Sequence, residues 1–163
     1  MVKKSIIFTI QCRVNSQRLP GKPFFNFFND TIIERIIRIA SVCIKRNNIF
    51  ILSGDLKKNY LLKDIAKKNG IKIFFGDENN VYQRYKKFLK RNKCDYVFRM
   101  TADNYLMQPR IIKNMMKDIV KYEYDYSYVY PLSHYAGEFI KTKIFFNKGE
   151  ISKKAKQHVT WDF

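Results

Sequence analysis

The chain alternates strand-length apolar runs with longer segments of helical periodicity, and this alternation constrains its fold class. The expected strands are residues 6–10, 48–52, 71–75 and 96–100. The expected helices, with apolar residues at three- and four-residue spacing, are residues 32–44, 59–69, 81–92 and 110–122. Strands separated by helices of this length usually pair in parallel through right-handed crossovers. The sequence therefore predicts a doubly wound, mostly parallel α/β sheet in a single domain over residues 1–163.

The last forty residues have weaker patterns. Residues 124–130 alternate polar and aromatic side chains, which is typical of a strand, and residues 138–146 are predicted as a further strand. Residues 150–157 are predicted as a short, charged helix.

The first expected strand leads into a cationic loop. Arg13, Arg18 and Lys22 lie within ten residues of one another, and Gly21 allows the backbone to come close to a ligand. In open α/β sheets, ligands bind at the carboxyl ends of the strands. Arginine can hold two phosphate oxygens at once, and lysine acts as a mobile point charge. The loop therefore predicts a polyphosphate site.

The same loop resembles the Q-A-R-x-x-S-x-R-L-P-G-K signature of the bacterial cytidylyltransferases grouped with spore coat polysaccharide biosynthesis protein F. These enzymes are related to the acylneuraminate and 3-deoxy-manno-octulosonate cytidylyltransferases. The matching residues are Gln11, Arg13, Ser16, Arg18, Leu19, Pro20, Gly21 and Lys22. The resemblance implies a Rossmann-like fold of the nucleotide-diphospho-sugar transferase type.

The reaction that this resemblance implies is attack by an acceptor oxygen on the α-phosphate of CTP, with release of pyrophosphate. The residues that would bind the nucleotide here are Gln11, Arg13, Ser16, Arg18 and Lys22. Three of them, Arg13, Arg18 and Lys22, would also act in catalysis by neutralising charge on the phosphates.

A second motif implies a metal ion. The segment Arg99-Met100-Thr101-Ala102-Asp103-Asn104 resembles the family's R-x-T-G-D-C/N-P, in which the aspartate holds the magnesium bound to the triphosphate. Asp103 would then bind Mg²⁺, with Arg99 and Thr101 beside the nucleotide. Magnesium usually takes one or two carboxylates together with phosphate oxygens and water. The structural alternative is that Asp103 caps the next turn.

Four further residues each have two open roles. Ser53 and Asp55 lie where the relatives' loop faces the nucleotide base, although both residue types are also common in turns. Arg84 matches the arginine of the family's G-x-x-x-x-V-x-x-R-Y, and it would either reach the base or hold the loop. His158 resembles the histidine of R-E-H-V-T, but an isolated histidine is more often structural.

The chain also departs from the family pattern. Phe139 and Lys141 replace both acids of the family's G-x-D-x-E segment. Three explanations stay open: Glu138 serves as a displaced second acid, Asp103 and the phosphates hold the metal alone, or activity has decayed. The chain stops at Phe163, so we expect it to lack the C-terminal segment that helps relatives close the acceptor site and often the dimer.

Composition limits the remaining classes. The formal net charge is +18 at pH 7, which is common in nucleic-acid binders. The lysines are spread along the whole chain without a block of like charges, so no nucleic-acid partner is expected. No apolar run of 18 residues and no signal-peptide cleavage site are seen, so we expect a cytoplasmic protein without a membrane span. The three cysteines fit reduced thiols.

The sequence thus predicts a Mg²⁺-dependent cytidylyltransferase that activates a sugar acid or a phosphorylated acceptor for surface polysaccharide or glycan biosynthesis. A homodimer is one option for its assembly. Two alternatives are an inactive nucleotide-binding relative that acts as a subunit or regulator, and a basic nucleic-acid-binding module. The latter requires binding that falls steeply with salt.

Overall fold

A central sheet organises the computed structural model, which describes residues 4–15, 19–131, 136–147, 152 and 156. Its six strands lie in the order β5-β4-β1-β6-β8-β7. Their bounds are β1 Ile6–Gln11, β4 Ile49–Ser53, β5 Lys72–Phe75, β6 Tyr96–Thr101, β7 Tyr126–Ser127 and β8 Glu138–Lys141. Strands β5, β4, β1 and β6 are parallel, while β8 runs antiparallel to β6 and to β7. The mostly parallel sheet is therefore confirmed.

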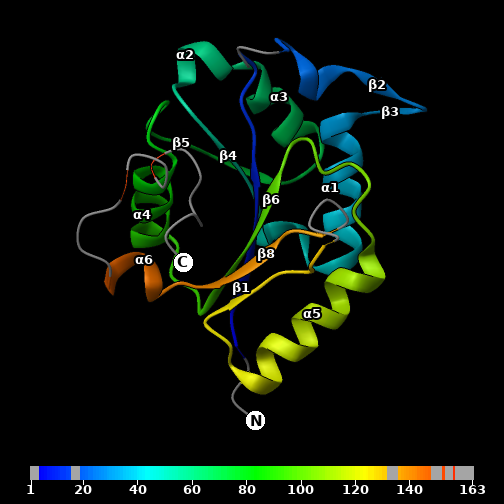
Figure 1. The fold of residues 1–163 in the computed structure, drawn as a ribbon. Helices are drawn as coiled ribbons and strands as arrows, with labels where there is room; N and C mark the ends of the chain where they lie inside the picture. Colours follow the sequence, from blue (N-terminus) through cyan, green and yellow to red (C-terminus); the bar gives the residue numbers. More distant parts are fainter. Residues whose placement is uncertain (1–3, 16–18, 132–135, 148–151, 153–155, 157–163) are drawn as a thin grey trace.

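Helices cover both faces of this sheet (Figure 1). One face packs against α1 (Ile32–Cys43), α3 (Leu61–Lys68) and α5 (Pro109–Tyr122), and the other against α4 (Val81–Arg91) and α6 (Ile144–Asn147). Successive strand residues point to opposite faces, so Phe50 joins the cluster of α4 whereas Ile51 joins that of α1. Two cores separated by one sheet are the doubly wound arrangement that the sequence predicts.

Helix α1 has the local signals from which a helix can be predicted in the sequence. Thr31 caps its first turn by accepting a hydrogen bond from the backbone N–H of Glu34, and the Glu34 carboxylate accepts from the backbone N–H of Thr31. This reciprocal capping box satisfies two backbone donors that a helix start otherwise leaves unpaired. Ile33, Ile36 and the other stripe residues of α1 are buried against the sheet.

The prediction of one helix over 59–69 is wrong in two respects. The helical structure begins before residue 59, and it is interrupted at Tyr60. A first turn, α2 (Leu56–Asn59), precedes Tyr60, and α3 (Leu61–Lys68) follows it. The carboxylate of Asp55 caps α2 by accepting from the backbone N–H of Lys57 at 2.9 Å. The helical structure therefore begins at Leu56, three residues before the predicted start at residue 59.

The predicted strand over 138–146 is correct only in its first half. After β8 the chain turns into α6, where Phe145 is buried and stacks on Tyr85 at a centroid separation of 5.5 Å. A strand would place Phe145 and Phe146 on opposite faces of the sheet, and both faces are covered by helices. In the helical turn, Phe145 packs on α4 and Phe146 stays 43% exposed. The apolar run was too short to distinguish the two.

Other local predictions have mixed outcomes. Of the expected strand over 124–130, only the two residues of β7 are a strand. Between the signature loop and α1 lie the short 3-10 helix η1 (Lys22–Phe24) and a small hairpin, in which β2 (Asn26–Phe27) pairs with β3 (Asp30–Thr31). The expected helix over 150–157 lies almost wholly outside the described residues.

The cysteines and the helices test two of the compositional expectations. Cys12, Cys43 and Cys94 are all free, and burial raises the pKa of the Cys12 thiol to about 12, so this thiol stays protonated. Among the residues that the structure describes, none of the helices has both the length and the apolar character that crossing a bilayer requires.

Candidate functional site

Most of the predicted site residues lie at or close to the carboxyl ends of the parallel strands. In Figure 1 this is the edge of the sheet at which α2 lies. Gln11 is the last residue of β1, Ser53 of β4 and Thr101 of β6, and the loops that follow carry Arg13, Asp55 and Asp103. Parallel strands bring their carboxyl ends to one edge, which is why residues far apart in sequence meet there. The fold thus assembles most of the predicted set, while Ser16, Arg18 and His158 lie outside the described residues.

Lys22 and Asp103 lie in direct contact. The Lys22 Nζ donates to Asp103 Oδ2 at 3.1 Å. Lys22 opens η1 directly after Gly21, whose φ of 72° is in the left-handed region that glycine adopts without strain. The Thr101 hydroxyl donates to the other carboxylate oxygen of Asp103.

The environment of Asp103 favours its ionised form. Burial alone would raise the pKa of this carboxyl, but the hydrogen bonds from Thr101 and Lys22 outweigh burial, so the pKa is lowered. The side chain remains 57% exposed. An ionised, accessible carboxylate is a suitable ligand for a hard divalent cation.

The oxygen donors around Asp103 are of the type that a hard divalent cation prefers. The Thr101 hydroxyl lies 3.0 Å from the amide oxygen of Asn104, so a carboxylate, a hydroxyl and an amide oxygen are grouped after β6. Within the described ranges, no group of three or more His, Cys, Asp or Glu side chains is arranged to hold a metal. This donor set suits an ion that takes its other ligands from phosphates and water.

Glu138 is engaged elsewhere in this structure. Its carboxylate accepts from Arg99 Nη1 at 2.7 Å and from the Tyr126 hydroxyl at 3.1 Å. Register explains the pair, because Arg99 and Glu138 are direct partners across β6 and β8. Phe139, which replaces a family acid, is fully buried in the core. To serve as the second acid for the metal, Glu138 would therefore have to give up its ion pair with Arg99.

Gln11 and Arg99 are brought together by the β1–β6 pairing. Arg99 Nε donates to Gln11 Oε1 at 3.1 Å, and the arginine is only 9% exposed. A chain of polar contacts thus runs from Gln11 through Arg99 to Glu138. Two predicted nucleotide-binding residues are fixed relative to each other at the end of β1.

Arg84 holds a loop in this structure. The side chain is fully buried, and its Nε and Nη2 donate to the carbonyl oxygen of Asp77 at 2.9 and 2.6 Å. Nη2 also lies 3.1 Å from the carbonyl oxygen of Glu78. Burial lowers the pKa of Arg84. Of the two roles left open by the sequence, these contacts support holding the loop after β5.

Asp55 has a contact that a turn requires, whereas the backbone of Ser53 pairs with the end of the neighbouring strand β5. Ser53 is fully buried, its carbonyl accepts from the backbone N–H of Gly76 at 3.1 Å, and its hydroxyl has no hydrogen-bond partner among the described residues. Asp55 caps α2, as described above. The geometry gives both residues a local structural role next to the signature loop.

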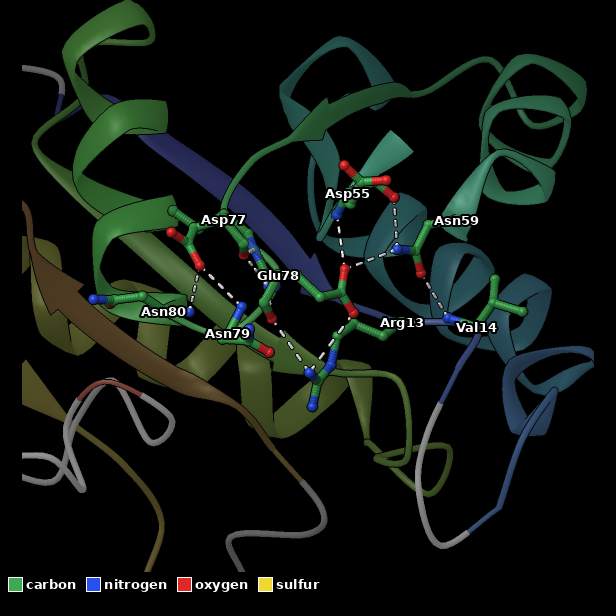
Figure 2. A network of polar contacts seen from close by, with 9 residues as sticks. Arg13, Val14, Asp55, Asn59, Asp77, Glu78, Asn79 and Asn80 are labelled. Atoms are coloured by element: carbon green, nitrogen blue, oxygen red, sulfur yellow. Dashed lines mark hydrogen bonds and ion pairs between the residues drawn. The ribbon is translucent and has the colours of Figure 1, made fainter. Parts of the chain in front are cut away.

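Sequence reasoning missed Glu78 and Asn59, which connect three of the loops at this edge (Figure 2). Asn59 is fully buried; its Oδ1 accepts from the backbone N–H of Val14 at 2.8 Å, and its Nδ2 donates to Glu78 Oε2 at 3.1 Å. Arg13 Nη1 donates to the Glu78 carbonyl oxygen at 3.2 Å. The signal that the sequence offered for Glu78 was an acidic residue in a predicted loop of a strongly basic chain.

Two surface hollows lie away from this edge. One, of about 310 Å³, is lined by residues including Glu34, Arg38 and Lys68, whose charges are paired within the protein. The other, of about 450 Å³, lies beside Lys90, Cys94 and Phe146. Neither is lined by a predicted site residue.

Comparison with known proteins agrees with the family resemblance. The family model described as Cytidylyltransferase matches residues 7–155. The spore coat polysaccharide biosynthesis protein SpsF of Bacillus subtilis (strain 168) is 28% identical over 164 residues, which cover 95% of this chain and 68% of that protein.

Two solved structures have the same fold. A cytidylyltransferase from Leptospira borgpetersenii superimposes with a TM-score of 0.89 at 22% identity, covering 98% of this chain and 70% of that one. A CMP:2-keto-3-deoxy-manno-octonic acid synthetase complexed with CTP superimposes with a TM-score of 0.69 at 12% identity, covering 95% and 83%.

Proposed function

Since this chain belongs to the cytidylyltransferase family, a family of nucleotidyltransferases, we propose that it transfers a cytidylyl group from CTP to an anionic acceptor. The acceptor would be a sugar acid or a phosphorylated compound used in polysaccharide or glycan biosynthesis. The observation that carries the proposal is the contact between Lys22 of the signature loop and Asp103 after β6, at 3.1 Å. The two motifs of the resemblance meet at one point of the sheet edge.

The reaction forms a bond between an acceptor oxygen and the α-phosphorus of CTP. The bond from the α-phosphorus to the bridging oxygen breaks, and pyrophosphate leaves with the electron pair. Such a transfer needs positioning and charge stabilisation more than covalent help from the protein. An attacking oxygen that is already ionised, as on a phosphate, has no proton to lose. A hydroxyl of a sugar acid would release its proton to solvent or to a base, and we assign no residue to that role.

The cations of the loop would stabilise the leaving group. Arg13 and Lys22 lie at the edge with exposed or half-buried side chains, and Arg18 would join them from the undescribed part of the loop. Asp103 would hold Mg²⁺, which offsets negative charge on the triphosphate when it is bound. Gln11, Ser16, Ser53, Asp55, Arg84, Arg99 and Thr101 stay proposed members of the nucleotide site.

A second candidate is a nucleotide-binding relative without turnover, acting as a subunit or regulator. Phe139 is a core residue and Glu138 is paired with Arg99. Asp103 is then the acid left for the metal among the positions that the family motifs indicate. This arrangement would bind CTP while lowering the rate of transfer.

Pyrophosphate release separates the two candidates. The purified protein is incubated with CTP, MgCl₂ and a panel of sugar acids and sugar phosphates, and pyrophosphate is measured by a coupled assay. Acceptor-dependent release that is lost in Arg13→Ala supports the enzyme. CTP binding without release for any acceptor supports the inactive relative, and absence of CTP binding contradicts both.

A further inference from the structure

We propose that Glu78 is a positioning residue that aims the guanidinium of Arg13 at the phosphates, an inference that rests on the proposed function. Three loops meet at Glu78 (Figure 2). Arg13 follows β1, Gly54 and Asp55 follow β4, and Glu78 itself follows β5. The residue therefore fixes one of the proposed catalytic cations relative to two other strand ends.

One oxygen of the Glu78 carboxylate is held by two neutral hydrogen-bond donors. Its Oε2 accepts from the backbone N–H of Asp55 at 2.7 Å and from Asn59 Nδ2 at 3.1 Å. Gly54 makes this approach possible, because a Cβ at that position would lie 1.7 Å from Oε2. With Oε2 satisfied by neutral donors, Oε1 is left to face Arg13.

Among the residues that the structure describes, Arg13 is held through one nitrogen. Its Nη1 donates to the Glu78 carbonyl oxygen at 3.2 Å and lies 3.8 Å from Glu78 Oε1. The side chain is 43% exposed. An arginine has five N–H donors in a planar fork, so anchoring at Nη1 leaves the other donors for phosphate oxygens.

The backbone next to Arg13 is tied to the same cluster. The buried side chain of Asn59 accepts from the backbone N–H of Val14 and donates to the carbonyl oxygen of Asp55 at 2.8 Å as well as to Glu78. Both ends of the Arg13 side chain are thereby fixed. A carboxylate this close to a phosphate site would otherwise repel the ligand, so its placement is best explained by orientation of the arginine.

A double-mutant cycle tests the inference. Binding of CTP and of inorganic pyrophosphate, each with MgCl₂, is measured by calorimetry for the wild type, Glu78→Gln, Arg13→Ala and the double variant. Glutamine keeps an acceptor for Asp55 but removes the charge facing Arg13. We expect Glu78→Gln to weaken binding about fivefold or more, and the double variant to bind within about twofold of Arg13→Ala, because residues that act as a unit are not additive.

Two further variants keep the test decisive if folding is disturbed. Gly54→Ala displaces the Glu78 carboxylate without altering any charge, and it should reproduce the loss seen in Glu78→Gln. Glu34→Gln is the matched control, because Glu34 also accepts hydrogen bonds and pairs with a cation, Lys68, but at the start of α1. Its affinity should stay within about twofold of the wild type.

Each outcome decides a different point. Additive losses in Glu78→Gln and Arg13→Ala, or tighter binding by Glu78→Gln, overturn the positioning role while leaving the proposed function intact. A wild type that binds pyrophosphate but not CTP contradicts the proposed function. The double-mutant cycle can then still be evaluated from the pyrophosphate affinities. A wild type that binds neither anion overturns both.

Discussion

Lys22 and Asp103, separated by 81 positions in the sequence, form an ion pair at 3.1 Å across the edge of the sheet. One is a proposed ligand of the triphosphate and the other of the metal. In this structure the two charges neutralise each other. When the triphosphate and the metal bind, the ion pair would be replaced by a contact of Lys22 with the triphosphate and a contact of Asp103 with the metal. Such an exchange links the affinity for the nucleotide to the presence of the metal.

The first prediction concerns this linkage. Mg²⁺ should tighten binding of CTP to the wild type by about tenfold or more, and Asp103→Asn should reduce that effect to about twofold. Titration calorimetry of CTP with and without MgCl₂ measures both. Asp125→Asn is the control, since Asp125 also pairs with lysines, Lys141 and Lys143, but at the far end of β8. An unchanged Mg²⁺ effect in Asp103→Asn contradicts the assignment.

The second prediction is a pH dependence of stability at the start of α1. Hydrogen bonds from Lys68 and Thr31 lower the pKa of Glu34 from 4.5 to about 2. A depressed pKa means that the ionised carboxylate stabilises the fold above pH 4.5 and that this contribution is lost as the pH falls toward about 2. Glu34→Gln should cost on the order of 1 kcal/mol at pH 7, because Lys68 is largely exposed.

Urea unfolding of the wild type and Glu34→Gln at pH 7, 4.5 and 2.5 measures this difference. The gap between the two proteins should be largest and constant above pH 4.5 and should narrow below it. A gap that is the same at all three values would show that the carboxylate charge is not what stabilises the helix start.

Much of this fold is readable from the sequence because its signals are local. The stripe of Ile33 and Ile36 and the cap at Thr31 are contained within one helix, and a parallel sheet then places strand ends such as Gln11 and Thr101 at one edge. Glu78 was missed because its partners, Arg13 and Asp55, lie 65 and 23 positions away, and no local pattern announces such contacts.

The third prediction tests the buried amide. Asn59→Leu keeps the number and branching of the side-chain heavy atoms but leaves the backbone N–H of Val14 and the carbonyl oxygen of Asp55 without this side-chain partner. It should lower the free energy of unfolding by about 1–3 kcal/mol, the usual cost of a buried unsatisfied polar group. Asn92→Leu, which removes an amide at the end of α4, should cost less. Equal losses in urea unfolding would argue against a special role for Asn59.

The fourth prediction tests the helical turn that the sequence pattern misassigned. Phe145→Ala removes a fully buried ring that packs on Tyr82 and Tyr85, and it should cost about 3–5 kcal/mol. Phe146→Ala should change stability by less than about 1 kcal/mol, because its ring is partly exposed. Similar costs for the two would mean that both rings are buried, as in a two-sided strand.

The central claim is that the edge carrying Lys22 binds the triphosphate of CTP. Its most direct test is a calorimetric titration of CTP, in MgCl₂, into the wild type and into Lys22→Ala. We predict saturable binding by the wild type and an affinity at least about tenfold lower in the variant, since a charge-assisted phosphate contact is removed. Equal affinities, or no CTP binding by the wild type, would contradict the account.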